Sequence, residues 1–233
     1  MATATQPRTT PGGDQLVELA GIDWKGYLTL LRLRGECSKP RIVYLDGNVS
    51  FKSPSYLHER LAERLGLFVV EVAVGLKIRF ISSGHTTFRR AKKKGGAEGD
   101  KSFYFENAQK IRGQDRIQLR NDPPPDLVIE VVHSHGAEEA REVWRRFGVP
   151  EVWVRNAEKL FILALNGEGR YVEASSSIAF PFLTAIEIFE WVSRSRDDDE
   201  LAWIIDLRDW VRTELFPRHH ARPDRTKGPN ESP

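Results

Sequence analysis

The stretch "DPPPDLVIEVV", residues 122–132, constrains the fold more than any other part of the chain. Its three consecutive prolines exclude a helix and hold the backbone extended on the approach to the aliphatic run. That run is typical of a central strand that is covered on both faces. It nevertheless carries Asp126 and Glu130, and a buried carboxylate is costly unless a cation meets it. The stretch therefore predicts a central strand whose end belongs to a site that attracts positive charge.

The rest of the pattern predicts one α/β domain, a mixed sheet with helices packed on it. The expected order is hairpin, helix, three strands, helix, three strands and closing helices. We expect a disordered segment over residues 1–20, a single domain over 21–216, and a disordered basic tail over 217–233 that includes His219 and His220. The predicted elements cover residues 41–52, 53–72, 76–84, 101–107, 127–132, 136–148, 151–156, 159–174, 184–195 and 199–216.

Composition narrows the class of protein. The 233 residues are 40% hydrophobic and 29% charged, which is enough for a packed core. The single cysteine, Cys37, excludes an intrachain disulfide and a cysteine metal cage, and fits a reducing cytoplasm. The polar start and the lack of a long apolar run predict neither a signal peptide nor a membrane span. Neither a glycine-rich phosphate loop nor a Gly-x-Ser-x-Gly nucleophile motif is present.

A local basic cluster interrupts an otherwise nearly neutral chain, whose net charge of +2 does not by itself indicate a nucleic-acid binder. The cluster has two readings: a solvated loop, or a segment that contacts phosphates. Its cations are Arg89, Arg90, Lys92, Lys93 and Lys94.

A metal site at Glu130 needs a second carboxylate from a neighbouring strand. Asp126 faces the same way as Glu130, but four residues of strand separate them by roughly 13 Å, too far to share one ion. The best partner is Asp100, at the start of the strand that follows the basic loop. Two such acids, waters and a backbone carbonyl such as that of Val131 make a Mg²⁺ site. A bound Mg²⁺ or Mn²⁺ activates water and stabilises charge on a phosphodiester.

Two further pairs of side chains are weaker candidates. His58 and Glu59 are adjacent on the first long helix, and either could point toward the carboxylates or belong to a solvated face. His133 and His135 follow the strand of Glu130, where they could transfer protons or simply end the strand.

Seven segments in series resemble the Uma-two family, bacterial restriction-endonuclease-like proteins of the PD-(D/E)XK nuclease superfamily. The resemblance covers about residues 41–215, and the segments are "SPSYLHE", "GHTTFRR", "GAEGDKSFYFEN", "DPPPDLVIEV", "FGVPEVW", "SIAFPFL" and "ELAWIIDLRDWVR". The resemblance implies a restriction-endonuclease-like mixed central β-sheet flanked by α-helices, a Mg²⁺-dependent phosphodiesterase site acting on DNA, and a homodimer.

Matched residue by residue, the resemblance assigns metal-ligand roles to Asp100 and Glu130, leaves Asp126 structural or in an outer shell, and pairs the family's helix histidine with His58, beside Glu59. Two departures stand out. Gly99 replaces the proline of the superfamily signature, and Val132 stands where a lysine is expected two residues after the glutamate.

The missing lysine leaves two hypotheses from different classes. In the first, the chain is a Mg²⁺-dependent DNA endonuclease in which Asp100 and Glu130 bind the ion. In the second, it is a catalytically inactive nuclease fold that acts as a nucleic-acid-binding or assembly module, which Val132 favours.

Overall fold

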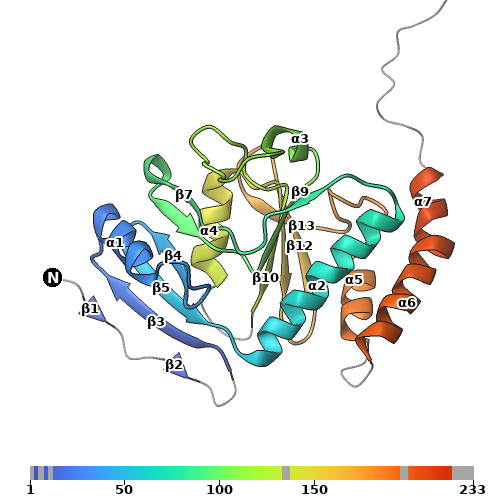
Figure 1. The fold of residues 1–233 in the computed structure, drawn as a ribbon, viewed down its shortest axis with the longest axis horizontal. Coiled ribbons are helices and arrows are strands. Elements are labelled where there is room, and N and C mark those ends of the chain that lie inside the picture. The colour runs from blue at the N-terminus through green and yellow to red at the C-terminus, as the bar shows by residue number, and fades with distance from the viewer. Residues whose placement is uncertain (1–2, 5–7, 10–12, 133–136, 195–198, 222–233) are drawn as a thin grey trace, which may run out of the picture.

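The computed structural model describes residues 3–4, 8–9, 13–132, 137–194 and 199–221 (Figure 1). Two β-sheets with helices packed on them form its centre, so the mixed α/β class predicted from the sequence is confirmed. The strands divide between two sheets rather than joining in one.

The six-stranded sheet contains the predicted central strand, β10 (Leu127–Val131). β10 runs parallel to β11 (Glu151–Arg155) and antiparallel to β9 (Lys101–Tyr104), so the sheet is mixed. Every residue of β10 is buried, as its aliphatic composition predicts. The sheet also includes β12 (Leu160–Leu165), β13 (Tyr171–Ala174) and β6 (Ile81–Ser82).

The second sheet is built around the predicted hairpin, β4 (Arg41–Leu45) and β5 (Asn48–Ser53). Asp46 and Gly47 both have positive φ at its turn, as an Asp-Gly pair predicts. The strands follow the order β1-β3-β5-β4-β8-β7, with β2 paired to β3. The other members are β1 (Thr3–Ala4), β2 (Arg8–Thr9), β3 (Gln15–Ala20), β7 (Phe88–Arg90) and β8 (Gly95–Ala97).

Two helices cover opposite faces of β10. α2 (Tyr56–Gly75) packs its buried leucines and valines on the face that carries Leu127 and Ile129. α4 (Ala137–Phe147) packs Val143 and Trp144 on the face that carries Val128. α5 (Ala185–Ser193), α6 (Glu200–Trp210), the π-helix η2 (Val211–Leu215) and α7 (Phe216–His220) lie outside α2 (Figure 1).

The N-terminal region is more ordered than predicted. Residues 15–20, expected in a disordered segment, form β3, whose backbone pairs with β5. Helix α1 (Trp24–Arg34), absent from the predicted elements, follows it. The C-terminal boundary also differs, because His219 and His220 lie in α7 rather than in a disordered tail.

Two parts of the chain differ in detail from the predicted elements. Residues 76–84 contribute only the short β6, because Lys77 adopts a positive φ of 58° and turns the chain after α2. Residues 95–97, which no predicted element covers, form β8, where a Cβ at Gly96 would overlap the ring of Tyr27. Single turns η1 (Ala91–Lys93) and α3 (Ala108–Ile111) complete the elements. His133 and His135 lie outside the described residues.

Among the described residues, none of the helices combines the length and the apolar character needed to cross a membrane.

Candidate functional site

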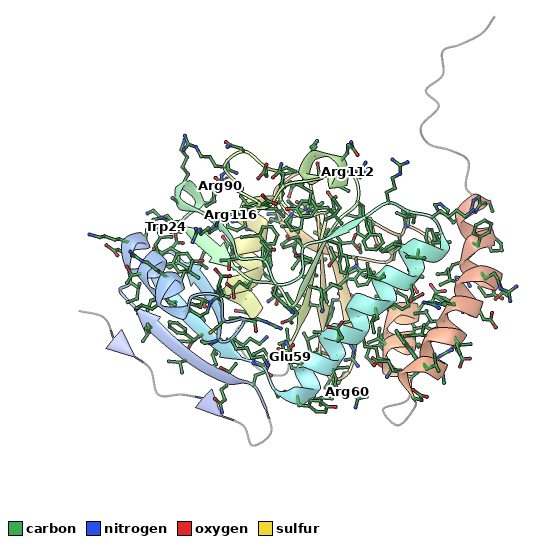
Figure 2. All side chains as sticks on the ribbon, viewed as in Figure 1. Trp24, Glu59, Arg60, Arg90, Arg112 and Arg116 are labelled. Carbon is green, nitrogen blue, oxygen red and sulfur yellow. The ribbon has the colours of Figure 1, made fainter. Side chains whose placement is uncertain are left out.

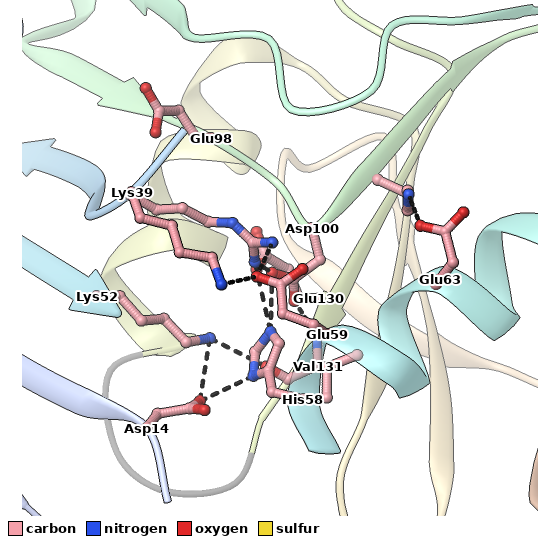
Figure 3. Close-up of polar contacts among 12 residues, drawn as sticks. Asp14, Lys39, Lys52, His58, Glu59, Glu63, Glu98, Asp100, Glu130 and Val131 are labelled. Atoms are coloured by element: carbon pink, nitrogen blue, oxygen red, sulfur yellow. Dashed lines mark hydrogen bonds and ion pairs between the residues drawn. The ribbon is translucent and has the colours of Figure 1, made fainter. Parts of the chain in front are cut away.

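Asp100 and Glu130 lie on neighbouring strands of the six-stranded sheet. β9 and β10 pair with Lys101 opposite Ile129. Asp100 directly precedes β9, and its backbone N–H donates to the Ile129 carbonyl at 3.0 Å, next to Glu130 in the chain. Both side chains are buried, and Figure 3 shows them in one cluster of charged groups. The pairing of β9 with β10 therefore brings the two predicted acids together.

A pair of cations comes from the other sheet. In the β4–β5 hairpin Arg41 is the partner of Lys52, so these two side chains also share a face. Like charges directly opposite each other repel and destabilise a hairpin unless acids compensate them. Here the open end of the hairpin meets the strands that carry Asp100 and Glu130 (Figure 3). Each like-charge pair is compensated by the other.

The Arg41 guanidinium joins several members of the cluster. Its Nη1 is in direct contact with Asp100 Oδ1, and its Nη2 lies 3.1 Å from Glu59 Oε1. The side chain is 4% exposed. Lys39 reaches the same Glu59 oxygen from 3.3 Å, at the solvent side. Burial alone raises the pKa of Glu59, but the charges of Arg41 and Lys39 outweigh it and lower that pKa.

His58 is held between two carboxylates. Its Nδ1 lies 2.8 Å from Asp14 Oδ2, and its Nε2 lies 2.9 Å from Asp100 Oδ1. The Ser55 hydroxyl caps α2 by accepting the backbone N–H of His58, which fixes the start of this helix beside β5. Burial lowers the pKa of His58 to about 4, although Asp14 opposes the shift. A neutral imidazole that donates from Nδ1 to Asp14 leaves its Nε2 as an acceptor for Arg41 Nη1, which lies 3.4 Å away.

Asp14 enters the cluster from the residue before β3. Besides His58, it accepts a hydrogen bond of 2.9 Å from the backbone N–H of Ser55. Burial alone raises its pKa, but these hydrogen bonds and the charge of Lys52 lower it overall. Asp14 thus ties the N-terminal strand to the first turn of α2.

Glu130 is buried between β10 and helix α4. The indole N–H of Trp144 on α4 donates to its Oε1 at 2.8 Å. Burial raises the pKa of Glu130, while Lys52, the Trp144 hydrogen bond and Arg41 oppose that shift. Burial likewise lowers the pKa of Lys52, which Glu130 and Asp14 oppose. The two groups compensate each other in a site that neither would occupy alone.

Lys52 brings an ammonium group close to position 132, where the family's lysine is expected and Val132 stands instead. Its Nζ donates to the carbonyl oxygen of Val131 at 3.1 Å, the residue just before Val132. A lysine two residues after Glu130 would have come from β10 itself, whereas this one comes from β5. The ammonium group absent from the strand is therefore present in the cluster.

Asp126 is a structural residue at the other end of β10. It accepts hydrogen bonds from the backbone N–H groups of Phe105 and Asn107, and from the Asn107 amide. These contacts anchor the turn after β9 and leave Asp126 outside the charged cluster.

Gly99, which replaces the signature proline, is closely packed. A Cβ at this position would lie 2.8 Å from Cγ1 of Val128 and 3.5 Å from the Trp144 ring. The position therefore excludes a side chain, and the close approach holds Asp100 against β10.

The predicted basic segment is separate from the carboxylates. Figure 2 shows Arg90, Arg112 and Arg116 along one edge of the molecule and Glu59 and Arg60 near the opposite edge. Arg89, Lys92, Lys93 and Lys94 share the β7–η1 segment of Arg90 and are exposed. The structure brings together Asp100, Glu130, His58 and Glu59, but not the basic segment.

The donor atoms of the cluster fit a divalent cation in type. The two carboxylates are oxygen ligands of the kind that Mg²⁺ and Mn²⁺ prefer, whereas the imidazole nitrogen is better suited to a second role beside the ion. Within the described ranges, however, no three His, Cys, Asp or Glu side chains form a ready-made metal site. Arg41 contacts Asp100, and Lys52 holds the Val131 carbonyl that the sequence offered as a ligand. The donors are present, but the protein's own cations already use them.

The sequence-based reasoning missed Asp14, Arg41 and Lys52. A signal for the two cations was available, because a two-residue Asp-Gly turn fixes the hairpin register and makes residues 41 and 52 partners. Asp14 carries no comparable signal, since its role depends on how β3 meets α2.

Comparisons with known proteins support the sequence resemblance. A family model, Uma2, described as "Putative restriction endonuclease", matches residues 24–194. Among solved structures, the chain is similar to a protein from Anabaena variabilis described as a putative nuclease belonging to DUF820, with 14% identity and a TM-score of 0.46. That match covers 80% of this chain and 97% of the other. None of the curated proteins matches.

Proposed function

Since the chain belongs to the Uma2 (Uma-two) family, we propose that it is a nuclease that hydrolyses phosphodiester bonds of DNA with a divalent metal ion, Mg²⁺ or Mn²⁺. The observation that carries the proposal is the convergence of Asp100 and Glu130, from two paired antiparallel strands, in one buried cluster of charged groups. Asp100 and Glu130 would hold the ion, with His58 and Glu59 beside them. When bound, the ion supplies an activated water and charge stabilisation at the phosphate.

The protein's own residues have separate roles in this proposal. His58 is oriented by Asp14 and keeps its Nε2 directed at Asp100. Lys52 provides, from β5, the positive charge that Val132 does not, next to where the scissile phosphate would bind. Glu59 pairs with the buried Arg41 and with the half-exposed Lys39 at the solvent side of the cluster. Trp144 and the packed Gly99 hold Glu130 and Asp100 in their orientations.

The basic segment has a role in binding rather than in chemistry. Its cations, the half-buried Arg90 and the exposed Arg89, Lys92, Lys93 and Lys94, contact backbone phosphates at a distance from the scissile bond. Replacing two of them should weaken DNA binding and reduce its salt dependence, while the cleavage rate at saturating DNA is unchanged.

A plasmid-nicking assay tests the proposal. The purified protein should nick supercoiled DNA with Mg²⁺ or Mn²⁺ and not with a chelator. Asp100→Asn and Glu130→Gln should abolish nicking, whereas Glu173→Gln, an exposed acid on β13, should leave it unchanged. Equal nicking by all four proteins would contradict the proposal.

The alternative function is a catalytically inactive nucleic-acid-binding or assembly module. One observation favours it: Arg41 and Lys52 neutralise the two carboxylates without any metal ion. Salt-sensitive DNA binding with no cleavage under either metal would support this alternative.

We further propose that the protein is a homodimer that acts in the cytoplasm, in line with its family and its single cysteine. Light scattering after size-exclusion chromatography tests the dimer, and a mass near 26.6 kDa would contradict it.

A further inference from the structure

The strongest unexplained feature of the cluster is an arginine in the place of a metal ion. We propose that Arg41 is the resident counter-cation of Asp100 in the metal-free protein, and that a divalent cation binds by displacing its guanidinium. This inference rests on the proposed nuclease function, because it concerns how the same carboxylates accept their ion.

Both oxygens of Asp100 are already bound. Oδ2 accepts a hydrogen bond of 2.6 Å from the backbone N–H of Val131, which fixes the carboxylate against β10. Oδ1 contacts Arg41 Nη1 and lies 2.9 Å from His58 Nε2. The backbone donor cannot leave without opening the sheet, and the His58 ring is held by Asp14. Arg41 is the member whose departure would free Oδ1 for a metal ion.

Glu59 would keep Arg41 paired after its guanidinium leaves Asp100. Its Nη2 pairs with Glu59, whose side chain is 30% exposed, and Glu59 is shared with the half-exposed Lys39. A rotation about the side-chain torsions would break the Asp100 contact while the Glu59 pair is kept. The guanidinium would then sit at the solvent side, where its planar donors match a phosphate. The exchange needs no backbone movement.

Because Arg41 and the metal ion would compete for Asp100, removing the charged Arg41 side chain should tighten metal binding rather than weaken it. A unit positive charge in contact with a ligand carboxylate opposes a second cation strongly at this depth. The full-length protein would be titrated with Mn²⁺, with free Mn²⁺ followed by electron paramagnetic resonance. Arg41→Gln should lower the dissociation constant for Mn²⁺ by at least about tenfold.

Lys39→Gln is the matched control, because Lys39 pairs with the same Glu59 oxygen but does not touch Asp100. It should change Mn²⁺ affinity less than about twofold, as expected for a half-exposed ion pair. Arg41→Lys keeps the charge and should give a smaller gain in affinity than Arg41→Gln.

The wild-type protein offers a measurement that does not depend on the folding of a variant. With nitrogen-15-labelled arginine, the guanidinium resonances of Arg41 should shift on adding Mg²⁺, because they lose their carboxylate partner. Those of Arg146, which pairs with Asp46 on another part of the surface, should not. Arg41 resonances unmoved by saturating Mg²⁺ would overturn the exchange.

The outcomes separate this inference from the proposed function. If wild type binds Mn²⁺ and Glu130→Gln does not, but Arg41→Gln binds no more tightly than wild type, the exchange is wrong and the metal site stands. If wild type and folded Arg41→Gln both fail to bind Mn²⁺, the metal-dependent function fails and the exchange with it. Tighter binding by Arg41→Gln, with Lys39→Gln unchanged, supports both.

Discussion

Trp144 gives the sharpest test of how the protein supports Glu130. Its indole N–H donates the one hydrogen bond that Glu130 receives among the described residues. Trp144→Phe removes this donor and keeps an aromatic ring in a fully buried position next to Phe88 and Phe147. The variant therefore isolates a single polar contact as far as one substitution allows.

The cost follows from two contributions. A lost hydrogen bond to a charged acceptor costs about 1.5–3 kcal/mol, and the smaller ring adds on the order of 1 kcal/mol of lost packing. The free energy of unfolding should fall by about 2–4 kcal/mol, measured by urea denaturation as a lower midpoint with an unchanged slope. Because the donor also orients a metal-binding carboxylate, Mn²⁺ affinity should fall by about 10–100-fold.

Trp153→Phe is the matched control. Trp153 is also fully buried and donates its indole N–H to a buried acid, Glu151, at 2.6 Å. Glu151 keeps backbone donors from Ile178 and Ala179 and lies outside the charged cluster. Trp153→Phe should therefore lower stability without changing Mn²⁺ affinity. Equal losses of affinity in the two variants, or a cost below about 0.5 kcal/mol for Trp144→Phe, would refute the reasoning.

Three further predictions concern single positions. Gly99→Ala should destabilise the fold by about 1–3 kcal/mol because its Cβ would overlap the neighbouring strand, whereas Gly167→Ala, which has open space, should change little in the same denaturation assay. Lys52→Met should reduce plasmid nicking at least about hundredfold, since it removes the buried charge beside Glu130, and nicking at the wild-type rate would argue against a role for Lys52. A hydrogen bond from Arg145 helps to lower the pKa of Glu142 to about 2. The ionised Glu142 therefore contributes fully to stability above about pH 4.5, and this contribution is lost as the pH falls toward 2. Glu142→Gln should remove that part of the pH dependence, worth about 1 kcal/mol after solvent screening, and an unchanged acid denaturation profile would contradict it.

The sequence predicted best those elements whose hydrophobic period and whose end residues indicate the same type of structure. β10 was predicted from its prolines and aliphatic run, and every one of its residues is buried. The helix predicted over residues 53–72 forms as α2, with the Ser55 hydroxyl as its cap, and the hairpin predicted over residues 41–52 turns at Asp46 and Gly47. In each case local chemistry and burial point to the same structure, so the tertiary context adds little to the decision.

The elements it missed have either weak patterns or roles set by distant partners. Helix α1 had an available start signal, Asp23, whose side chain accepts the Gly26 N–H at 2.7 Å, but its apolar stripe is interrupted by polar residues. β3 has mostly half-buried residues and becomes a strand by pairing with β5. The strand predicted over residues 76–84 is shortened because Lys77 adopts a positive φ. Lysine rarely adopts this conformation, so the residue type gave no sign of it in the sequence.

The residues of the candidate site also differ in how far the sequence predicts them. Asp100 and Glu130 could be paired from the sequence because strand order and family motif agreed. The cations that meet them could have been paired with each other through the hairpin register, but not with the acids, since nothing local says which sheet the hairpin faces. Asp14 could not be placed at all, because its partners lie on α2.

The pairing of like charges explains why this cluster persists in a buried place. Arg41 and Lys52 are partners on one hairpin, and Asp100 and Glu130 come from the paired β9 and β10 regions into one cluster, so each pair of like charges alone would repel. Bringing the two sheets together exchanges two repulsions for cross-sheet attractions, of which the Arg41–Asp100 contact is the most direct. The fold can therefore form without a metal ion, unlike a structural zinc domain, whose folding depends on its ion. A metal ion that binds here must compete with an interaction that already helps to join the two sheets, which is why affinity for the ion and stability of the metal-free protein are opposed at Arg41.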